Sequence, residues 1–285
     1  MARGKIFFVI ITSLLILFFI SQIFDVNTRL ISSNFKPNPL TKIVMNSLKD
    51  SQGTYAVVIK NFKNGQEFAL NENRVYEPGS LYKLWLMATV YTHIKDGRLK
   101  EDDILSQNIP TLNQKFAIID PELTEGGITA TVSQSLHQMI TISHNYAALL
   151  LAEKVGNSQI KVFLNQNGLN ASDIGDPPQT TASDIALFYE KLYRKELVTP
   201  EFSDKMIEIL KKQQLNDGLP RYLPPETIVA HKTGDLGWFK HDAGVVFTQK
   251  GDYLIIILSE SDSPTGAQNR IALLSKAVYD YFNKD

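Results

Sequence analysis

The sequence predicts an α+β fold in which an antiparallel five-stranded sheet takes its strands from both ends of the chain. Two strand-like segments early in the chain are joined by an Asn64-Gly65 turn, and three more lie near the C-terminus. The long stretch between them is patterned as helices. Strands and helices segregated along a chain in this way are typical of α+β proteins.

The predicted elements follow in order along the chain. Residues 54–60 and 66–70 form the first two strands, and residues 80–95 form a helix that begins after Pro78-Gly79 and ends at Gly97. Further helices are predicted at 133–139, 145–155, 157–167, 182–194, 203–213 and 266–282, and strands at 228–234, 243–249 and 253–259. The short links between the last three strands favour antiparallel pairing.

The N-terminal part of the chain differs in composition from the rest. Residues 6–24 carry no charge and follow Arg3 and Lys5. Because roughly 19 helical residues at about 1.5 Å each match the hydrocarbon thickness of a bilayer, we expect a membrane anchor, with the rest of the chain on the extracytoplasmic side. A cleaved signal peptide is the alternative, although no A-x-A-like site follows. The expected division is a cytoplasmic tail at 1–5, a transmembrane anchor at 6–24, a linker at 25–42 and one domain at 43–285.

The overall composition excludes several kinds of function. A formal net charge of −1 gives no indication of a nucleic-acid partner. The chain has no cysteine, so disulfides and thiolate chemistry are excluded. Its five histidines include no pair at helical i,i+4 spacing, so we expect no metal site. We expect no cofactor either. We expect the domain to be a monomer.

Lys83 is the single charged residue between Glu77 and Lys95, within an otherwise apolar helix. Proteins usually avoid burying an unpaired ammonium. Ser80 would lie on the same helical face one turn earlier. Because burial lowers the pKa of a lysine, its neutral amine could act as general base for a serine nucleophile. The alternative is a snorkelling surface lysine, since Ser-x-x-Lys occurs twice more in this chain.

Two further patterns follow Ser80 and Lys83 in the chain. Ser143-His144-Asn145 opens a predicted helix, and Lys232-Thr233-Gly234 ends a predicted strand. Taken alone, Ser143 could be a helix cap and Lys232 an edge-strand lysine before a turn. The three patterns in this order, on a helix, a loop and a strand, form a specific combination.

With these three motifs the chain resembles the penicillin-recognising serine hydrolases, and the class A β-lactamases in particular. The resemblance extends from about Thr54 to the C-terminus and includes SHNYAALLLAEKVG, TTASDIALFYEKL and GLPRYLPPETIVAHKTG. It implies the serine β-lactamase/transpeptidase-like fold. It also implies a substrate that is a β-lactam or a D-Ala-D-Ala peptide.

The resemblance assigns the reacting groups. Ser80 would attack the substrate carbonyl and carry the acyl group, and Lys83 would be its base or proton relay. Ser143 would pass a proton to the leaving nitrogen. The backbone N–H of Ser80 would supply one donor of an oxyanion hole, where each donor is typically worth about 3 kcal/mol.

The resemblance also assigns substrate-binding groups. Asn145 would bind the substrate amide and steady the catalytic lysine. Lys232 and Thr233, next to Gly234, would hold the substrate carboxylate. The backbone N–H of Asp235 would complete the oxyanion hole.

The sequence departs from the class A pattern in the loop that carries the deacylating glutamate. Between Gly156 and Thr180 there is no glutamate, and the carboxylates are Asp173 and Asp176, in a Gly/Pro-rich turn where aspartate is commonly structural. His144 replaces the usual aspartate of its motif. Because acylation residues are present and the usual deacylating base is absent, we expect a long-lived acyl-enzyme with β-lactams.

Five other residues have both a functional and a plain explanation. Asp235 could repel an anionic substrate unless its side chain points away. Arg270 and Lys240 could each add a positive charge for the substrate carboxylate, or be solvated surface bases. Tyr82 and Trp238 could line the cleft or simply pack against the core.

Three functions remain open at this point. The first is a β-lactam hydrolase of class A type that opens the amide bond through Ser80. The second is a membrane-anchored D,D-carboxypeptidase or transpeptidase of peptidoglycan, which β-lactams would inhibit. The third is a non-catalytic sensor that is acylated, although a tail of about five residues is short for a signalling output.

Overall fold

The computed structural model describes residues 38–284. The predicted tail at 1–5 and anchor at 6–24 lie outside this range. Within the described part of the chain, no helix is both long enough and apolar enough to span a bilayer.

The first described helix, α2 (Pro39–Leu48), begins inside the segment predicted as a linker. Asn38 and proline explain the start of the helix. The Asn38 side chain Oδ1 accepts the N–H of Leu40 at 3.1 Å, and proline occupies the first helical position, where its missing N–H costs nothing. Residues 39–42 are therefore helical, and the predicted boundary at residue 43 falls within a helix.

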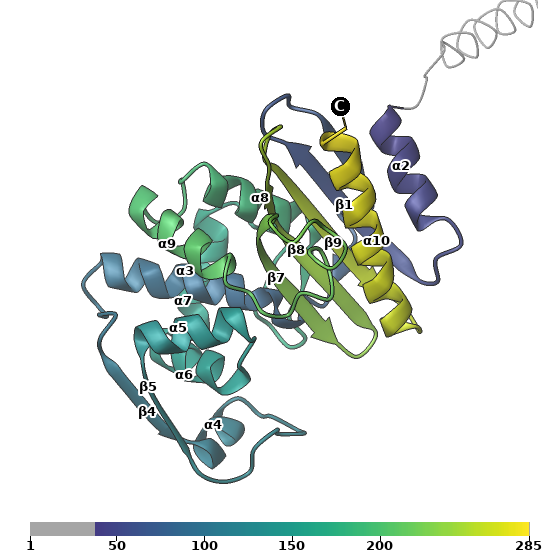
Figure 1. The fold of residues 1–285 in the computed structure, drawn as a ribbon. Helices are drawn as coiled ribbons and strands as arrows, with labels where there is room; N and C mark the ends of the chain where they lie inside the picture. The colour runs from purple at the N-terminus through teal and green to yellow at the C-terminus, as the bar shows by residue number, and fades with distance from the viewer. Residues whose placement is uncertain (1–37, 285) are drawn as a thin grey trace, which may run out of the picture. The chain divides into compact units, whose positions relative to one another are not determined.

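The predicted antiparallel sheet is present and joins distant parts of the chain (Figure 1). Its strands are β1 (Thr54–Asn61), β2 (Glu67–Leu70), β7 (Ile228–Leu236), β8 (Phe239–Phe247) and β9 (Tyr253–Glu260). Their order is β2-β1-β9-β8-β7, and every neighbouring pair is antiparallel. Strand β1 pairs with β9 from Thr54 opposite Glu260 to Asn61 opposite Tyr253. The α+β class and the composition of the sheet are thus as predicted.

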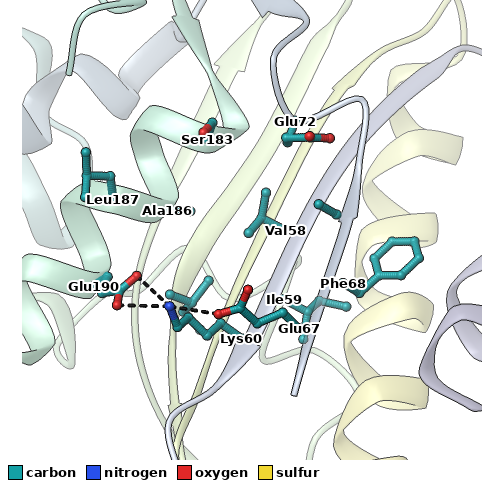
Figure 2. A pocket seen from close by; sticks show the side chains of 12 residues that line it. Val58, Ile59, Lys60, Glu67, Phe68, Glu72, Ser183, Ala186, Leu187 and Glu190 are labelled. Carbon is teal, nitrogen blue, oxygen red and sulfur yellow. Dashed lines mark hydrogen bonds and ion pairs between the residues drawn. The ribbon is translucent and has the colours of Figure 1, made fainter. Parts of the chain in front are cut away.

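Helices cover the sheet and build a second, helical part. They are α3 (Tyr82–Lys95), α5 (Val132–Thr141), α6 (Asn145–Val155), α7 (Asn157–Gln166), α8 (Ala182–Tyr193), α9 (Pro200–Leu210) and α10 (Pro264–Phe282). The sheet lies between α8 and α10, as Figure 2 shows. Helix α3 is surrounded by α5, α6, α7 and α9, which is why it has almost no polar face: residues 83–91 are all buried.

Several short elements were not predicted. Helix α4 (Ile109–Lys115) lies between β4 (Ile104–Asn108) and β5 (Gly127–Thr131), which pair with each other. The two-residue strands β3 (Val75–Tyr76) and β6 (Thr180–Thr181) also pair. The segment 116–126, which connects α4 to β5, is called the 116–126 loop below.

Candidate active site

Ser80 lies in the 3-10 turn η1 (Gly79–Leu81) that leads into α3, and β7 passes directly beside it. Two glycines permit this approach. A Cβ on Gly234 would lie 2.6 Å from Pro78 O, and a Cβ on Gly79, whose φ is +49°, would lie 2.9 Å from Asp235 N. The Ser80 turn and the end of β7, which were predicted to supply the two oxyanion-hole donors, are therefore adjoining segments.

Lys83 is fully buried, and its amine nitrogen has three acceptors. Nζ donates to Ser143 O at 2.6 Å, to Ser143 Oγ at 3.1 Å and to Asn145 Oδ1 at 2.6 Å. An ammonium carries three N–H donors, so this arrangement suits the charged form. Burial lowers the pKa of Lys83 to about 7, partly opposed by the negative charge of Glu122. The side chain can therefore lose a proton near neutral pH.

Lys232 is the second fully buried lysine and enters from β7. Its Nζ donates to Ser143 Oγ at 3.1 Å and to Thr233 O at 2.9 Å. Burial, reinforced by the charge of Lys83, lowers the pKa of Lys232 well below its usual range. Ser143 Oγ thus accepts from both lysines, which leaves its own hydroxyl hydrogen free to be donated elsewhere.

The structure explains how Ser143 is held between the two lysines. Ser143 has φ +56°, a left-handed conformation that is uncommon outside glycine and costs conformational energy. The N-cap of α6 is His144, whose Nδ1 accepts the Ala147 N–H at 3.1 Å. His144, the middle residue of the Ser-His-Asn motif, therefore caps the helix. The simpler explanation of Ser143 as the helix cap does not hold.

Glu122 belongs to this cluster, although nothing in the sequence pointed to it. Its Oε1 accepts a hydrogen bond from Asn145 Nδ2 at 2.5 Å. It lies in the 116–126 loop, and with Tyr82 and Asn145 it lines a cavity of about 210 Å³. Contact between a loop carboxylate and a motif residue 23 positions away leaves no local sequence pattern. Of the two aromatic residues that could line the cleft, Tyr82 borders this cavity.

The other sequence candidates lie apart from Lys83 and Ser143. Asp235 is exposed and forms an ion pair with Lys240, so neither charge is isolated. Arg270, on α10, donates to the Ser47 carbonyl at 2.7 Å. Trp238 lies in the turn after β7 and is 61% exposed.

The loop that should carry a deacylating base is short. Helix α7 occupies residues 157–166, so residues 167–179 remain as loop. Asp173 forms an ion pair with Lys161 at 3.1 Å, and Asp176 is exposed. Within residues 38–284, neither aspartate forms a hydrogen bond or ion pair with Lys83, Ser143 or the groups bound to them.

A larger cavity of about 420 Å³ lies between α8 and the strands β1 and β2 (Figure 2). Three of its charged groups pair with one another, because Lys60 Nζ lies 2.8 Å from Glu67 and 3.0 Å from Glu190. None of the clustered lysine, serine or asparagine side chains lines it. This cavity is larger than the one beside Glu122 and yet lies away from the clustered lysines.

Comparison with known proteins agrees with the geometry. The model of the β-lactamase enzyme family matches residues 39–282, which is most of the chain. The chain belongs to the β-lactamase enzyme family. The family predicted from the three motifs is thereby confirmed, and with it a serine hydrolase of the β-lactamase type.

Individual relatives of this β-lactamase family member are distant. The chain is 23% identical to the β-lactamase VEB-1 of Pseudomonas aeruginosa over 279 residues, which cover 89% of this chain and 93% of the relative. Among solved structures it resembles PBP-A, with a TM-score of 0.78 at 23% identity, covering 88% of this chain and 97% of that one. It also resembles a β-lactamase from Sphaerobacter thermophilus DSM 20745, with a TM-score of 0.76 at 22% identity and coverage of 85% and 96%. At this identity the structural likeness establishes the fold.

Proposed function

We propose that this protein reacts with β-lactams through Ser80, opening the amide bond and carrying the acyl group as an ester. The observation that supports this most directly is the position of Ser143 Oγ, which accepts from the buried amines of Lys83 and Lys232 at 3.1 Å each. That arrangement provides a base of lowered pKa and a hydroxyl proton donor within one hydrogen-bonded cluster.

The proposed acylation moves one proton through this cluster. Lys83, as the neutral amine, removes the Ser80 hydroxyl proton while Ser80 Oγ bonds to the carbonyl carbon. The backbone N–H groups of Ser80 and Asp235 stabilise the resulting oxyanion. As the C–N bond breaks, Ser143 gives its proton to the leaving nitrogen and regains one from the Lys83 ammonium.

The remaining residues would bind the substrate. Lys232 and Thr233 would attract its carboxylate, with Gly234 allowing close approach of the strand. Asn145 Nδ2 has two hydrogens, and one remains for the substrate amide when Glu122 accepts the other.

We further propose that deacylation is slow. The residues 167–179 contain no glutamate, and Asp173 is held by Lys161. An acyl-enzyme complex with penicillin G is the subject of the structure of a PBP-A variant that this chain resembles, with a TM-score of 0.76 at 23% identity. A D,D-carboxypeptidase or transpeptidase acting on peptidoglycan is the second candidate, because the missing glutamate would not impair its acylation step.

Intact-mass spectrometry of the full chain with a penicillin, sampled from seconds to hours beside Ser80→Ala, tests the proposal. We expect an adduct on Ser80 that persists for hours and is absent from the variant. No adduct on the native chain would overturn acylation through Ser80. An adduct that disappears within seconds as free drug is hydrolysed would overturn slow deacylation. Release of D-Ala from a D-Ala-D-Ala peptide would select the peptidase.

For the location, we propose that residues 6–24 anchor the domain on the extracytoplasmic side of the cell membrane. The uncharged run and the preceding Arg3 and Lys5 support this proposal. The expected result is recovery of the intact chain with membranes and digestion of its domain by protease added to spheroplasts. Recovery of a soluble chain that lacks these residues would indicate a cleaved signal peptide instead.

A further inference from the structure

Glu122 is joined to the Lys83 amine through one intervening amide. Asn145 Nδ2 donates to Glu122 Oε1 at 2.5 Å, and Asn145 Oδ1 accepts from Lys83 Nζ at 2.6 Å. A carboxylate can only accept, so it selects the NH₂ end of the amide and turns the oxygen end toward the lysine. The exposed carboxylate therefore determines which end of Asn145 faces a buried amine.

The charge of Glu122 has no counterpart among its neighbours in sequence. No lysine or arginine occurs between Lys115 and Lys154. Within residues 38–284, Glu122 forms no ion pair, and its one hydrogen bond is to Asn145. The carboxylate is thus free of a competing cation, and its field acts on Lys83 across the amide.

We propose that Glu122 is a positioning residue of the active site, which acts through Asn145 to orient the amide and to favour the ammonium form of Lys83. The inference rests on the proposed function, in which Lys83 must be neutral to accept the Ser80 proton. It adds a carboxylate from the 116–126 loop to a site otherwise built by α3, α6 and β7.

The charged groups facing Lys83 act in opposite directions. Burial on α3 disfavours its ammonium form. The neighbouring amine of Lys232 on β7 is itself driven toward its neutral form by burial and by the charge of Lys83. The Tyr82 ring, 6.0 Å from Nζ on the same helix, and the acceptors on the segment that opens α6 are uncharged. Glu122 supplies the opposing negative charge. Its removal should therefore lower the pKa of Lys83 and increase the neutral fraction below pH 7.

Two substitutions separate orientation from charge. Glu122→Gln keeps an oxygen that can accept from Asn145 and removes the charge, whereas Glu122→Ala removes both. Glu125→Gln is the matched control, because Glu125 is an exposed carboxylate of the same loop with no hydrogen bond or ion pair in the described structure. The measurement is the second-order rate of Ser80 acylation by penicillin from pH 5 to 9, with the full chain at low ionic strength.

We expect the acidic limb of the rate profile to move to lower pH by about 0.5 unit or more in Glu122→Gln, with an unchanged plateau. Glu122→Ala should show the same shift and a plateau lowered about 3- to 10-fold, the range for one hydrogen bond. In 1 M salt the Debye length is about 3 Å, so the difference in the pH of the acidic limb between the native chain and Glu122→Gln should become smaller. A Glu122→Gln profile that coincides with the native and Glu125→Gln profiles would overturn the proposal.

A second measurement keeps this inference distinct from the proposed reaction. In protein labelled with ¹³C-lysine, the Lys83 Cε resonance, assigned by its absence from Lys83→Met, reports protonation without any substrate. It should titrate at lower pH in Glu122→Gln than in the native chain or Glu125→Gln. If the native chain is not acylated but this shift occurs, the proposed function fails and the electrostatic role stands. If acylation occurs and no shift is seen, only the inference fails.

Discussion

The two walls of the candidate active site are built in different ways. Lys232, on the β7 wall, is fully buried, and its strand is hydrogen-bonded along its length to β8 and packed against the Ser80 turn at Gly234. On the opposite wall Glu122 is exposed, in a loop, and is held by one side-chain contact with Asn145. The difference indicates that the β7 wall fixes the position of the Lys232 amine through the paired backbone of its strand. The wall formed by the 116–126 loop adjusts the proton affinity of Lys83 and can be altered without disturbing the fold.

Removing Lys83, which donates to Ser143 Oγ and to Asn145 Oδ1, should have the largest effect. We expect Lys83→Met to slow acylation of Ser80 by about 10²- to 10⁴-fold, the range for a general acid–base group, in the intact-mass assay. Near-native rates in this variant would show that another group takes the serine proton.

The same substitution should change how stability depends on pH. The pKa of Lys83 is lowered from 10.5 to about 7 in the folded protein, so between these values the unfolded chain binds a proton that the native chain does not. The free energy of unfolding of the native chain should therefore rise with pH across this window from this group. Because Met cannot titrate, urea titrations at pH 7 and pH 10 should show the native chain gaining stability relative to Lys83→Met.

Glycine-to-alanine substitutions in the two walls test how tightly each wall is packed. In Gly234→Ala the new Cβ would meet Pro78 O at 2.6 Å and Leu81 Cγ at 3.0 Å. We expect a loss of about 1–3 kcal/mol in the free energy of unfolding, together with slower acylation because the Ser80 turn is displaced. The matched control is Gly127→Ala, next to the 116–126 loop, where the nearest atom would be 3.5 Å away and the expected change is within about 0.5 kcal/mol. Equal losses in the two variants would contradict the difference between the walls.

The smallest effect is expected at the end of the β7 wall, where Lys240 pairs with Asp235. Lys240→Ala leaves the carboxylate unpaired near the predicted position of an anionic substrate, so acylation should slow by about 2- to 5-fold at low ionic strength. Lys240→Ala combined with Asp235→Asn should recover the native rate, because the repulsion is removed while the backbone N–H remains. Failure of the double variant to recover would mean that Lys240 itself contacts the substrate.

The sequence predicted those features that are determined by residues close together along the chain. The Asn64-Gly65 turn and the flanking strands follow from neighbouring residues, with Gly65 at φ +71°. The burial of Lys83 follows from a helix with no polar face, and its residues 83–91 are indeed buried. The three motifs then come together because the elements that carry them, α3, the start of α6 and β7, pack around one site.

Two kinds of feature were not predicted from the sequence. Some are contacts between residues far apart along the chain, and others depend on the conformation of one residue. Strands β4 and β5 are separated by a helix and a loop, with no tight turn to indicate their pairing. The contact of Glu122 with Asn145 crosses a loop. His144 as a cap requires a particular ring orientation, and the left-handed Ser143 has no glycine to signal it.

The place of β1 inside the sheet has a consequence for how the protein is made. Strand β1 is among the first parts of the domain to leave the ribosome, and its partner β9 is among the last. Within residues 38–284, β8 and β7 are hydrogen-bonded to the other strands only through β9. The hairpin that carries Lys232 therefore cannot join the early strands until Tyr253–Glu260 has emerged. A nascent or truncated chain that stops before this strand would contain Ser80, Lys83, Ser143 and Lys232, but its β7–β8 hairpin would not be paired with the sheet. Reactivity toward penicillin should therefore appear only when translation is nearly complete.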